Sequence, residues 1–415
     1  MRTTLLLVSS LLSIVTSGQI SGSSIFLQGQ FVEVGINGCG VYGSHEEPPV
    51  GPFGEYHIPN ANGLGYVADS EMDGWEVHTD PDAPDFCGDY FTPGSPEEGW
   101  AIQYGDSVYE NHSTYCTGYG GFPYVDTIAD IPGSNTIYSD SAGLQTAVWE
   151  GWLVDDDLDL SLKQITTLAD TSLYFISTIE ITNNGATDLT DLYYIRNVDP
   201  DQDFDHCGIY ATYNSILSNT PASDTVLLTA IGGSCGCYFG TTAVDPRARV
   251  SFGYFYLSPN KPSDAYYGLG DYPYHLDGED VFVDCAVQIT YKFDLPSGAT
   301  TSLSYARLFG ESAVESAQQA LNELNEPVIT SNVDVLPPTI SLFPNPVSDQ
   351  LNLELADWVT NAIIEVVTVN GGEVMLNQSV QEQLSTFDVS TWHPGVYLVK
   401  VCTAAGCFGQ TILVQ

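Results

Sequence analysis

Short runs of β-forming residues, separated by turn residues, recur along most of the chain and restrict what it can fold into. Between about Ile25 and Phe309, segments rich in Val, Ile, Thr, Tyr and Phe alternate with clusters of Gly, Pro, Asn and Asp. Runs at hairpin spacing are typical of an antiparallel sandwich. The clearest predicted strands cover residues 146–153, 158–168, 173–182, 192–198, 225–231, 249–257, 286–295 and 301–308. The sequence therefore predicts an all-β main domain, built as a large antiparallel β-sandwich.

Two stretches depart from this pattern. Residues 35–133 are dense in Gly, Pro and Tyr, so we expect long, disulfide-bearing loops over the sheets there rather than a run of strands. Apolar residues recur at helical spacing between residues 313 and 324, and Pro327 follows them. This spacing predicts one helix, at the edge of the sandwich, that closes the main domain.

The two ends of the chain differ from its middle. Residues 1–18 have a basic start, an apolar run from Leu5 to Val15 and small residues before Gly18, which predicts a cleaved secretory signal peptide. No later segment is long and apolar enough to span a membrane. We expect the main domain over residues 19–329, a polar linker over residues 330–339 and a small second β-domain over residues 340–415.

The charge of the chain excludes several classes of function. It has 53 Asp and Glu residues against 9 Lys and Arg residues, for a formal net charge of −44. A surface this acidic repels nucleic-acid backbones and anionic membranes. It is tolerated where salt or divalent cations screen it, which favours a saline or calcium-containing exterior.

The last fifth of the chain carries three separated motifs. Residues 342–349 read Leu-Phe-Pro-Asn-Pro-Val-Ser-Asp and precede an alternating run, residues 370–374 form an Asn-Gly turn, and residues 387–401 run from Phe387 through Trp392 and Gly395 to Val401. In order and spacing this resembles the type A sorting domain of cargo exported by the Bacteroidetes type IX secretion system. The resemblance implies that residues 340–415 fold as a small β-sandwich, contact the type IX machinery, and direct the protein to secretion or to the outer-membrane surface.

Nine cysteines in an exported chain indicate disulfide bonds rather than metal thiolates. Cys402 and Cys407 flank a four-residue turn between two predicted strands, so we expect them to form a disulfide across a hairpin. The other seven are odd in number, which leaves one free or paired elsewhere. These are Cys39, Cys87, Cys116, Cys207, Cys235, Cys237 and Cys285.

Two acidic segments have the spacing of calcium ligands. Asp69, Glu71 and Asp73 stand at alternate positions before Gly74, with Asp80 at the twelfth position, as in an EF-hand-type loop. A second segment spaces four carboxylates two residues apart, so that an extended chain would place them on one face. These are Asp199, Asp201, Asp203 and Asp205. Calcium would relieve their repulsion, and in both segments a solvated acidic turn is the alternative.

One carboxylate has aromatic neighbours. Glu150 lies between Trp149 and Trp152, and aromatic rings beside a carboxylate suit a sugar ring. In a strand, the tryptophans could equally belong to the core. A glycosidase would need a second carboxylate, for which Asp199 and Asp201 are candidates.

The sequence contains no zinc-hydrolase pair, serine nucleophile elbow or phosphate-binding glycine loop. We therefore expect a secreted, surface-displayed binding or structural protein, stabilised by calcium and in contact with extracellular polysaccharide or another surface. The alternative is a secreted glycan-active hydrolase or lyase on the same scaffold, with Glu150, Asp199 and Asp201 as candidate catalytic residues. The sequence leaves open the ligand, whether the protein is catalytic, its oligomeric state and its fate after export.

Overall fold

The chain divides into two compact units, Met1–Asn325 and Glu326–Gln415. The structure, a computed structural model, describes residues 19–57, 63–72, 98–112, 130–155, 157–202, 204, 208–219, 224–234, 236–254, 260–271, 273–325, 341–344, 347–355, 362–368, 374–380, 382–393, 395–403 and 406–414. The predicted signal peptide and linker lie outside these residues.

A nine-stranded antiparallel sheet is the largest element of the first unit. In spatial order its strands are β16 (Val281–Val283), β12 (Thr212–Ser218), β13 (Thr225–Gly232), β14 (Tyr238–Val244), β18 (Thr300–Leu308), β10 (Tyr174–Asn183), β9 (Leu158–Ala169), β8 (Leu144–Asp155) and β7 (Gly133–Ser141). Strands β8, β9, β10, β13 and β18 confirm the sequence prediction to within a few residues.

Two smaller sheets complete this unit. One has five strands in the order β15 (Ala248–Gly253), β17 (Ala286–Leu295), β11 (Leu189–Val198), β5 (Glu98–Tyr104) and β6 (Ser107–His112). The other has four, β1 (Ile20–Ser21), β2 (Ser24–Gln28), β3 (Val32–Ile36) and β4 (Tyr66–Ala68). The expectation of loops alone over residues 35–133 is therefore wrong, because β4, β5 and β6 fall within that stretch.

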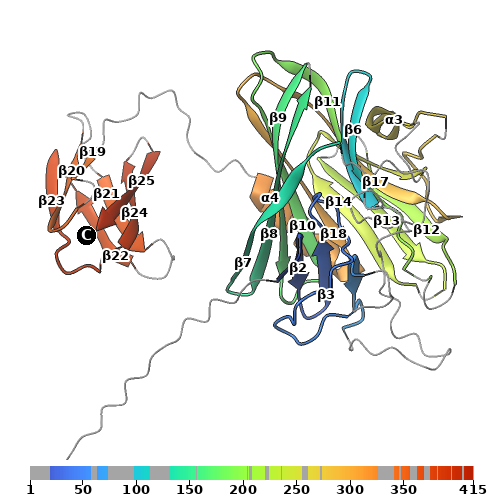
Figure 1. Cartoon of the computed structure of the whole chain (residues 1–415), viewed down its shortest axis with the longest axis horizontal. Coiled ribbons are helices and arrows are strands. Elements are labelled where there is room, and N and C mark those ends of the chain that lie inside the picture. The colour runs from blue at the N-terminus through green and yellow to red at the C-terminus, as the bar shows by residue number, and fades with distance from the viewer. Residues whose placement is uncertain are drawn as a thin grey trace, which may run out of the picture. The chain divides into compact units, whose positions relative to one another are not determined.

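The two larger sheets lie face to face and enclose the main core (Figure 1). Strand β9 shows how the alternation works, since every second residue from Leu158 to Leu168 is buried while the residues between them are more exposed. Across the core, the rings of Trp100 and Trp149 meet edge to face with centroids 5.4 Å apart. The predicted all-β sandwich is confirmed.

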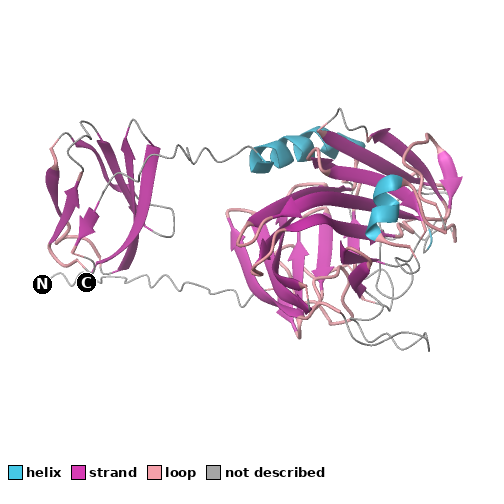
Figure 2. Ribbon diagram, turned by 90° about the horizontal axis from the view of Figure 1, so that it is seen from above, coloured by secondary structure: helices cyan, strands magenta, loops and turns pink. Residues whose placement is uncertain are grey.

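The two helices among the described residues, α3 (Pro262–Tyr267) and α4 (Val314–Asn325), lie on the outside of the strands (Figure 2). The predicted helix is α4, which follows a 3-10 turn, η1 (Glu311–Ala313). It buries Ala317 and Leu321 and contacts β14, β18 and β10, which are neighbours in the middle of the nine-stranded order rather than its outermost strands. The second helix, α3, was not predicted and packs on the five-stranded sheet.

The second unit is a small two-sheet β-domain with its own core. One sheet contains β19 (Ser341–Phe343), β20 (Gln350–Glu354) and β23 (Leu384–Asp388); the other contains β22 (Val374–Val380), β21 (Ala362–Thr368), β24 (Gly395–Thr403) and β25 (Gly406–Val414). Leu351 and Leu353 of the first sheet pack with Ile364, Val366 and Val399 of the second. The expected small C-terminal β-sandwich is confirmed.

A buried ion pair joins the layers of the main unit. Arg196 on β11 and Glu98 on β5 have fully buried side chains, and the guanidinium donates to both carboxylate oxygens through Nε and Nη2. Its Nη1 also donates to Gln164 Oε1 on β9, at 3.0 Å, and to the Gly40 carbonyl, at 3.1 Å. One guanidinium therefore connects the five-stranded sheet, the nine-stranded sheet and the chain that follows β3.

Removing one member of this pair should cost far more than removing both. We expect Arg196→Met alone to lower the free energy of unfolding by roughly 3–5 kcal/mol, because it leaves the Glu98 carboxylate buried without its counter-charge. The double substitution Arg196→Met with Glu98→Leu should recover part of that loss. Urea denaturation of the four proteins gives the coupling energy, and losses that simply add would contradict the pairing.

A second buried carboxylate has no cationic partner among the described residues. Glu33 on β3 faces a small apolar cluster of Phe26, Tyr56, Leu64 and Val67. Its carboxyl group accepts hydrogen bonds from Gln28 Nε2, at 2.9 Å, and from the His57 backbone N–H, at 2.6 Å. Burial outweighs both hydrogen bonds and raises the pKa of Glu33 to about 8.

This shift makes stability fall as pH rises. Between pH 4.5, the ordinary value, and about pH 8, the folded chain keeps a proton that the unfolded chain has lost, so stability decreases through that window. We expect Glu33→Gln to remove this dependence and to raise the free energy of unfolding by roughly 2–4 kcal/mol above pH 8, with little change at pH 4.5. Urea titrations at pH 4.5, 7 and 9 measure it, and an equal effect at all three values would refute it.

Candidate functional site

Strand alternation separates the two tryptophans beside Glu150. On β8, Trp149 is buried and its indole N–H donates to the Gly38 carbonyl at 2.8 Å. Glu150 and Trp152 point to the opposite, outer face of the nine-stranded sheet, where Trp152 is 55% exposed. The prediction that Trp149 binds a ligand is therefore corrected, because residues three apart in a strand face opposite ways. Trp152 keeps its predicted position next to Glu150.

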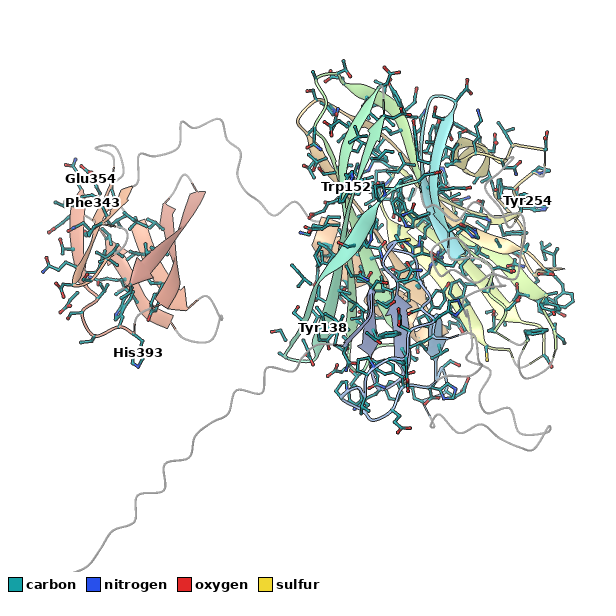
Figure 3. The ribbon with its side chains drawn as sticks, in the orientation of Figure 1. Tyr138, Trp152, Tyr254, Phe343, Glu354 and His393 are labelled. Atoms are coloured by element: carbon teal, nitrogen blue, oxygen red, sulfur yellow. The ribbon has the colours of Figure 1, made fainter. Side chains whose placement is uncertain are left out.

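A groove of about 480 Å³ runs over the outer face of β8, β9 and β10. The register explains its lining, since Trp152 pairs with Ser161 and Glu150 pairs with Lys163, each across β8 and β9. Strand β10 adds the two residues that complete these rows, Thr182 opposite Ser161 and Glu180 opposite Lys163. Figure 3 labels Trp152 on this sheet. The result is an exposed indole beside two rows of polar side chains.

The charges in the groove are two carboxylates around one ammonium group. Lys163 Nζ lies 3.4 Å from Glu180 Oε2, and both side chains are about one-third exposed. Glu150 and Glu180 stand one on either side of Lys163, two strand spacings or about 10 Å apart. These side chains offer hydrogen-bond donors and acceptors on a fixed, partly hydrated surface. Sequence reasoning missed Lys163 and Glu180, which only strand pairing brings to Glu150.

Three carboxylates meet elsewhere, where β11 ends and β17 begins. The residues are Asp199, Asp201 and Asp284. Each has one carboxylate oxygen within 4.8 Å of an oxygen of the other two. Asp199 and Asp201 are buried and Asp284 is exposed. The antiparallel register pairs Val198 with Val287, so the residues after β11 run alongside those before β17.

The structure thus brings together part of the predicted acidic segment and adds a residue that the sequence analysis missed. Asp203 and Asp205 lie outside the described residues, so their part in a site stays a prediction. Asp284 is 83 positions from Asp201, and no local pattern marks it. The groove that contains Glu150 includes neither Asp199 nor Asp201, so the structure does not join them there as a catalytic pair.

The electrostatics of the acidic cluster follow from burial. Burial raises the pKa of the Asp284 carboxyl group above its usual value. Burial, reinforced by the charges of Asp199 and Asp284, raises the pKa of the neighbouring Cys285 thiol. The surroundings of Asp284 and Cys285 therefore disfavour negative charge, and a divalent cation with a preference for oxygen ligands would oppose that effect.

The first acidic segment is described only in part. Asp69 follows β4 directly and is buried, whereas Glu71 is exposed. Asp73 and Asp80 lie outside the described residues. Calcium binding by this segment stays a prediction.

The cysteines are also described in part. Cys402 and Cys407 stand directly opposite each other in the β24–β25 hairpin, as a disulfide across it requires, and their bonding stays a prediction. Cys285 is free and buried, whereas Cys39 and Cys237 are disulfide-bonded.

Comparison with solved structures finds distant likeness only. A polysaccharide lyase aligns with 10% identity over 95% of this chain and 47% of its own, with a TM-score of 0.30. A galactose mutarotase-like protein from Lactobacillus casei aligns with 9% identity over 69% of this chain and 99% of its own, with a TM-score of 0.31. The chain thus spans about half the length of the lyase, and at these scores the likeness identifies no common site. No curated protein sequence matches the chain significantly.

The C-terminal unit matches a known family. Residues 341–415 match the family described as the secretion system C-terminal sorting domain, which confirms the resemblance drawn from the three motifs. None of the helices that the structure describes has the length and apolar composition that a membrane span requires. Residues 341–415 are therefore a type IX secretion C-terminal sorting domain, which marks the protein as secreted or attached to the outer cell surface.

Proposed function

We propose that this secreted protein binds carbohydrate through the groove over β8, β9 and β10. The observation that carries the proposal is the exposed indole of Trp152 beside Glu150, Ser161 and Lys163. A sugar ring presents an apolar C–H face that packs on an aromatic ring, while its hydroxyl groups need donors and acceptors around the edge. The groove offers both, and its polar rows span a length comparable to two linked sugar rings.

The charge of the groove favours a neutral glycan. Two carboxylates, Glu150 and Glu180, accompany the single ammonium group of Lys163. The chain as a whole carries a net charge of −44, which repels polyanions such as uronic-acid polymers at low salt. Neutral sugars meet no such repulsion, and carboxylates are good acceptors for their hydroxyl groups.

Substitution of Trp152 tests this proposal. We expect Trp152→Ala to weaken binding of a neutral oligosaccharide by roughly 10- to 100-fold, equivalent to about 1.4–2.8 kcal/mol. Its melting temperature should barely change, because the side chain is half exposed. The matched control is Val154→Ala, two residues along on the same outer face and 68% exposed, which should bind like the parent protein.

A glycan array followed by calorimetric titration of the mature chain makes the measurement. Equal loss in both variants, or no loss in Trp152→Ala, would contradict binding at the groove. Incubation with the same glycans also tests the enzymatic alternative, for which Glu150 and Glu180 are the carboxylates that share the groove. New reducing ends that disappear with Glu150→Gln would replace the binding proposal with a glycan-active enzyme.

We also propose that calcium binds at Asp199, Asp201 and Asp284. The supporting observation is that their carboxylate oxygens approach within 4.8 Å although two of the three groups are buried. Calcium takes six to eight oxygen ligands, so three carboxylates would need backbone carbonyls or water to complete the shell. Bound calcium would hold the end of β11 beside the start of β17.

Removal of calcium should therefore destabilise the protein. We expect a chelator to lower the melting temperature of the mature chain by several degrees, since ligand at 100 times its Kd contributes about 2.7 kcal/mol. Asp284→Asn should reduce that difference, whereas Asp140→Asn, an exposed carboxylate on β7, should leave it intact. A calcium effect that persists unchanged in Asp284→Asn would place the ion elsewhere.

A further inference from the structure

A second arginine is buried in the main core, and it lacks the partners of Arg196. Arg307 on β18 is 0% exposed. In the nine-stranded sheet it pairs with Phe175 on β10 and with Thr241 on β14. The aromatic rings of Phe239 and Tyr305 lie 5.6 and 5.5 Å from its guanidinium carbon. It therefore lies among aromatic side chains on the inner face of the sheet.

The guanidinium of Arg307 lacks a hydrogen-bond acceptor in the part of the chain that the structure describes. Among the residues that the structure describes, no atom accepts from its Nε, Nη1 or Nη2. The nearby buried carboxylate of Glu98 is committed elsewhere, because its oxygens accept from Arg196 and, at 2.8 Å, from the backbone N–H of Tyr42. The buried carboxylate that interacts electrostatically with Arg307 is therefore already ion-paired with Arg196.

Burial of the Arg307 guanidinium destabilises the folded protein unless another group neutralises its charge. A guanidinium stays protonated in proteins, and a buried ion without a counter-charge costs several kcal/mol even after relaxation. A desolvated cation–π contact contributes about 2 kcal/mol, which is less than that cost. Such contacts also leave every N–H donor unsatisfied.

Two hydroxyl groups on residues that neighbour Arg307 likewise have no hydrogen-bond partner among the residues that the structure describes. They are Tyr305 Oη, whose ring packs next to Arg307, and Thr241 Oγ1, on the residue paired with Arg307 across β14 and β18. Both hydroxyl groups can donate a hydrogen bond. Together with the guanidinium of Arg307, they provide several donors and one positive charge. Its chemical complement is an acceptor that carries negative charge.

We propose that Arg307, with the hydroxyl groups of Tyr305 and Thr241, holds a small inorganic anion such as chloride inside the main unit. A monatomic anion accepts hydrogen bonds from any direction, so it suits three donor groups of different geometry. It also supplies the negative charge that a water molecule lacks. Chloride abounds in the saline exterior to which a secreted protein is exposed.

Melting temperatures of the mature chain in different sodium salts test the proposal. At equal ionic strength and constant calcium, chloride and bromide should raise the melting temperature by a few degrees relative to methanesulfonate, whose larger anion should not fit beside a fully buried side chain. Arg307→Met should abolish the difference. Arg249→Met, which removes an arginine whose guanidinium donates to the Ala248 carbonyl, is the matched control and should retain it.

Two further measurements keep the proposal testable if Arg307→Met does not fold. Thr241→Val and Tyr305→Phe preserve shape, remove one hydroxyl group each and should reduce the chloride-dependent shift. A crystal grown in bromide should show an anomalous peak beside the Arg307 guanidinium. Melting that is independent of the anion, or density there without anomalous signal, would show that water alone fills the site and would overturn the proposal.

Discussion

The buried contact between Arg196 and Glu98 is the constraint on which the main unit depends. It is charged, fully desolvated and bidentate, and it reaches Gln164 on the facing sheet, so the two sheets can approach only where that geometry is satisfied. The ring of Tyr42 lies 4.2 Å from the guanidinium carbon and adds the chain after β3 to the same assembly. The apolar core supplies most of the burial, whereas this pair selects how the layers align.

The packing of the layers explains how the outer face of an antiparallel sheet can present a binding surface. Once the inner face of β8, β9 and β10 is packed, period-two alternation forces Glu150, Trp152, Lys163 and Glu180 outward in rows at strand spacing. Helix α4 covers part of the same sheet over β14, β18 and β10. The proposed sugar platform therefore needs no loop to form it, and its geometry is as rigid as the strands beneath it.

Local sequence patterns predicted the elements whose formation depends on neighbouring residues alone. Regular β-runs such as β9 and β10 were identified because their apolar residues alternate. Strand β5 was missed, since six of its seven residues are buried and no alternation marks it. Trp149 was a candidate ligand contact with the core as its alternative, although its spacing from Trp152 already implied that the two face opposite sides. Asp284 could not be found, because only pairing between strands far apart in the chain brings it to Asp201. Lys163 was missed because its position opposite Glu150 depends on the register of the β8–β9 hairpin.

The proposed contact between the protein and carbohydrate is made by Trp152 on the outer face of β8, β9 and β10. Hydroxyl-radical footprinting of the mature chain, with and without a saturating neutral oligosaccharide, tests it at the level of the side chain. If Trp152 binds the oligosaccharide, it should be oxidised readily in the free protein and protected in the complex. Buried Trp149 should stay unreactive in both states. Equal oxidation of Trp152 in both states, with the oligosaccharide bound, would contradict it.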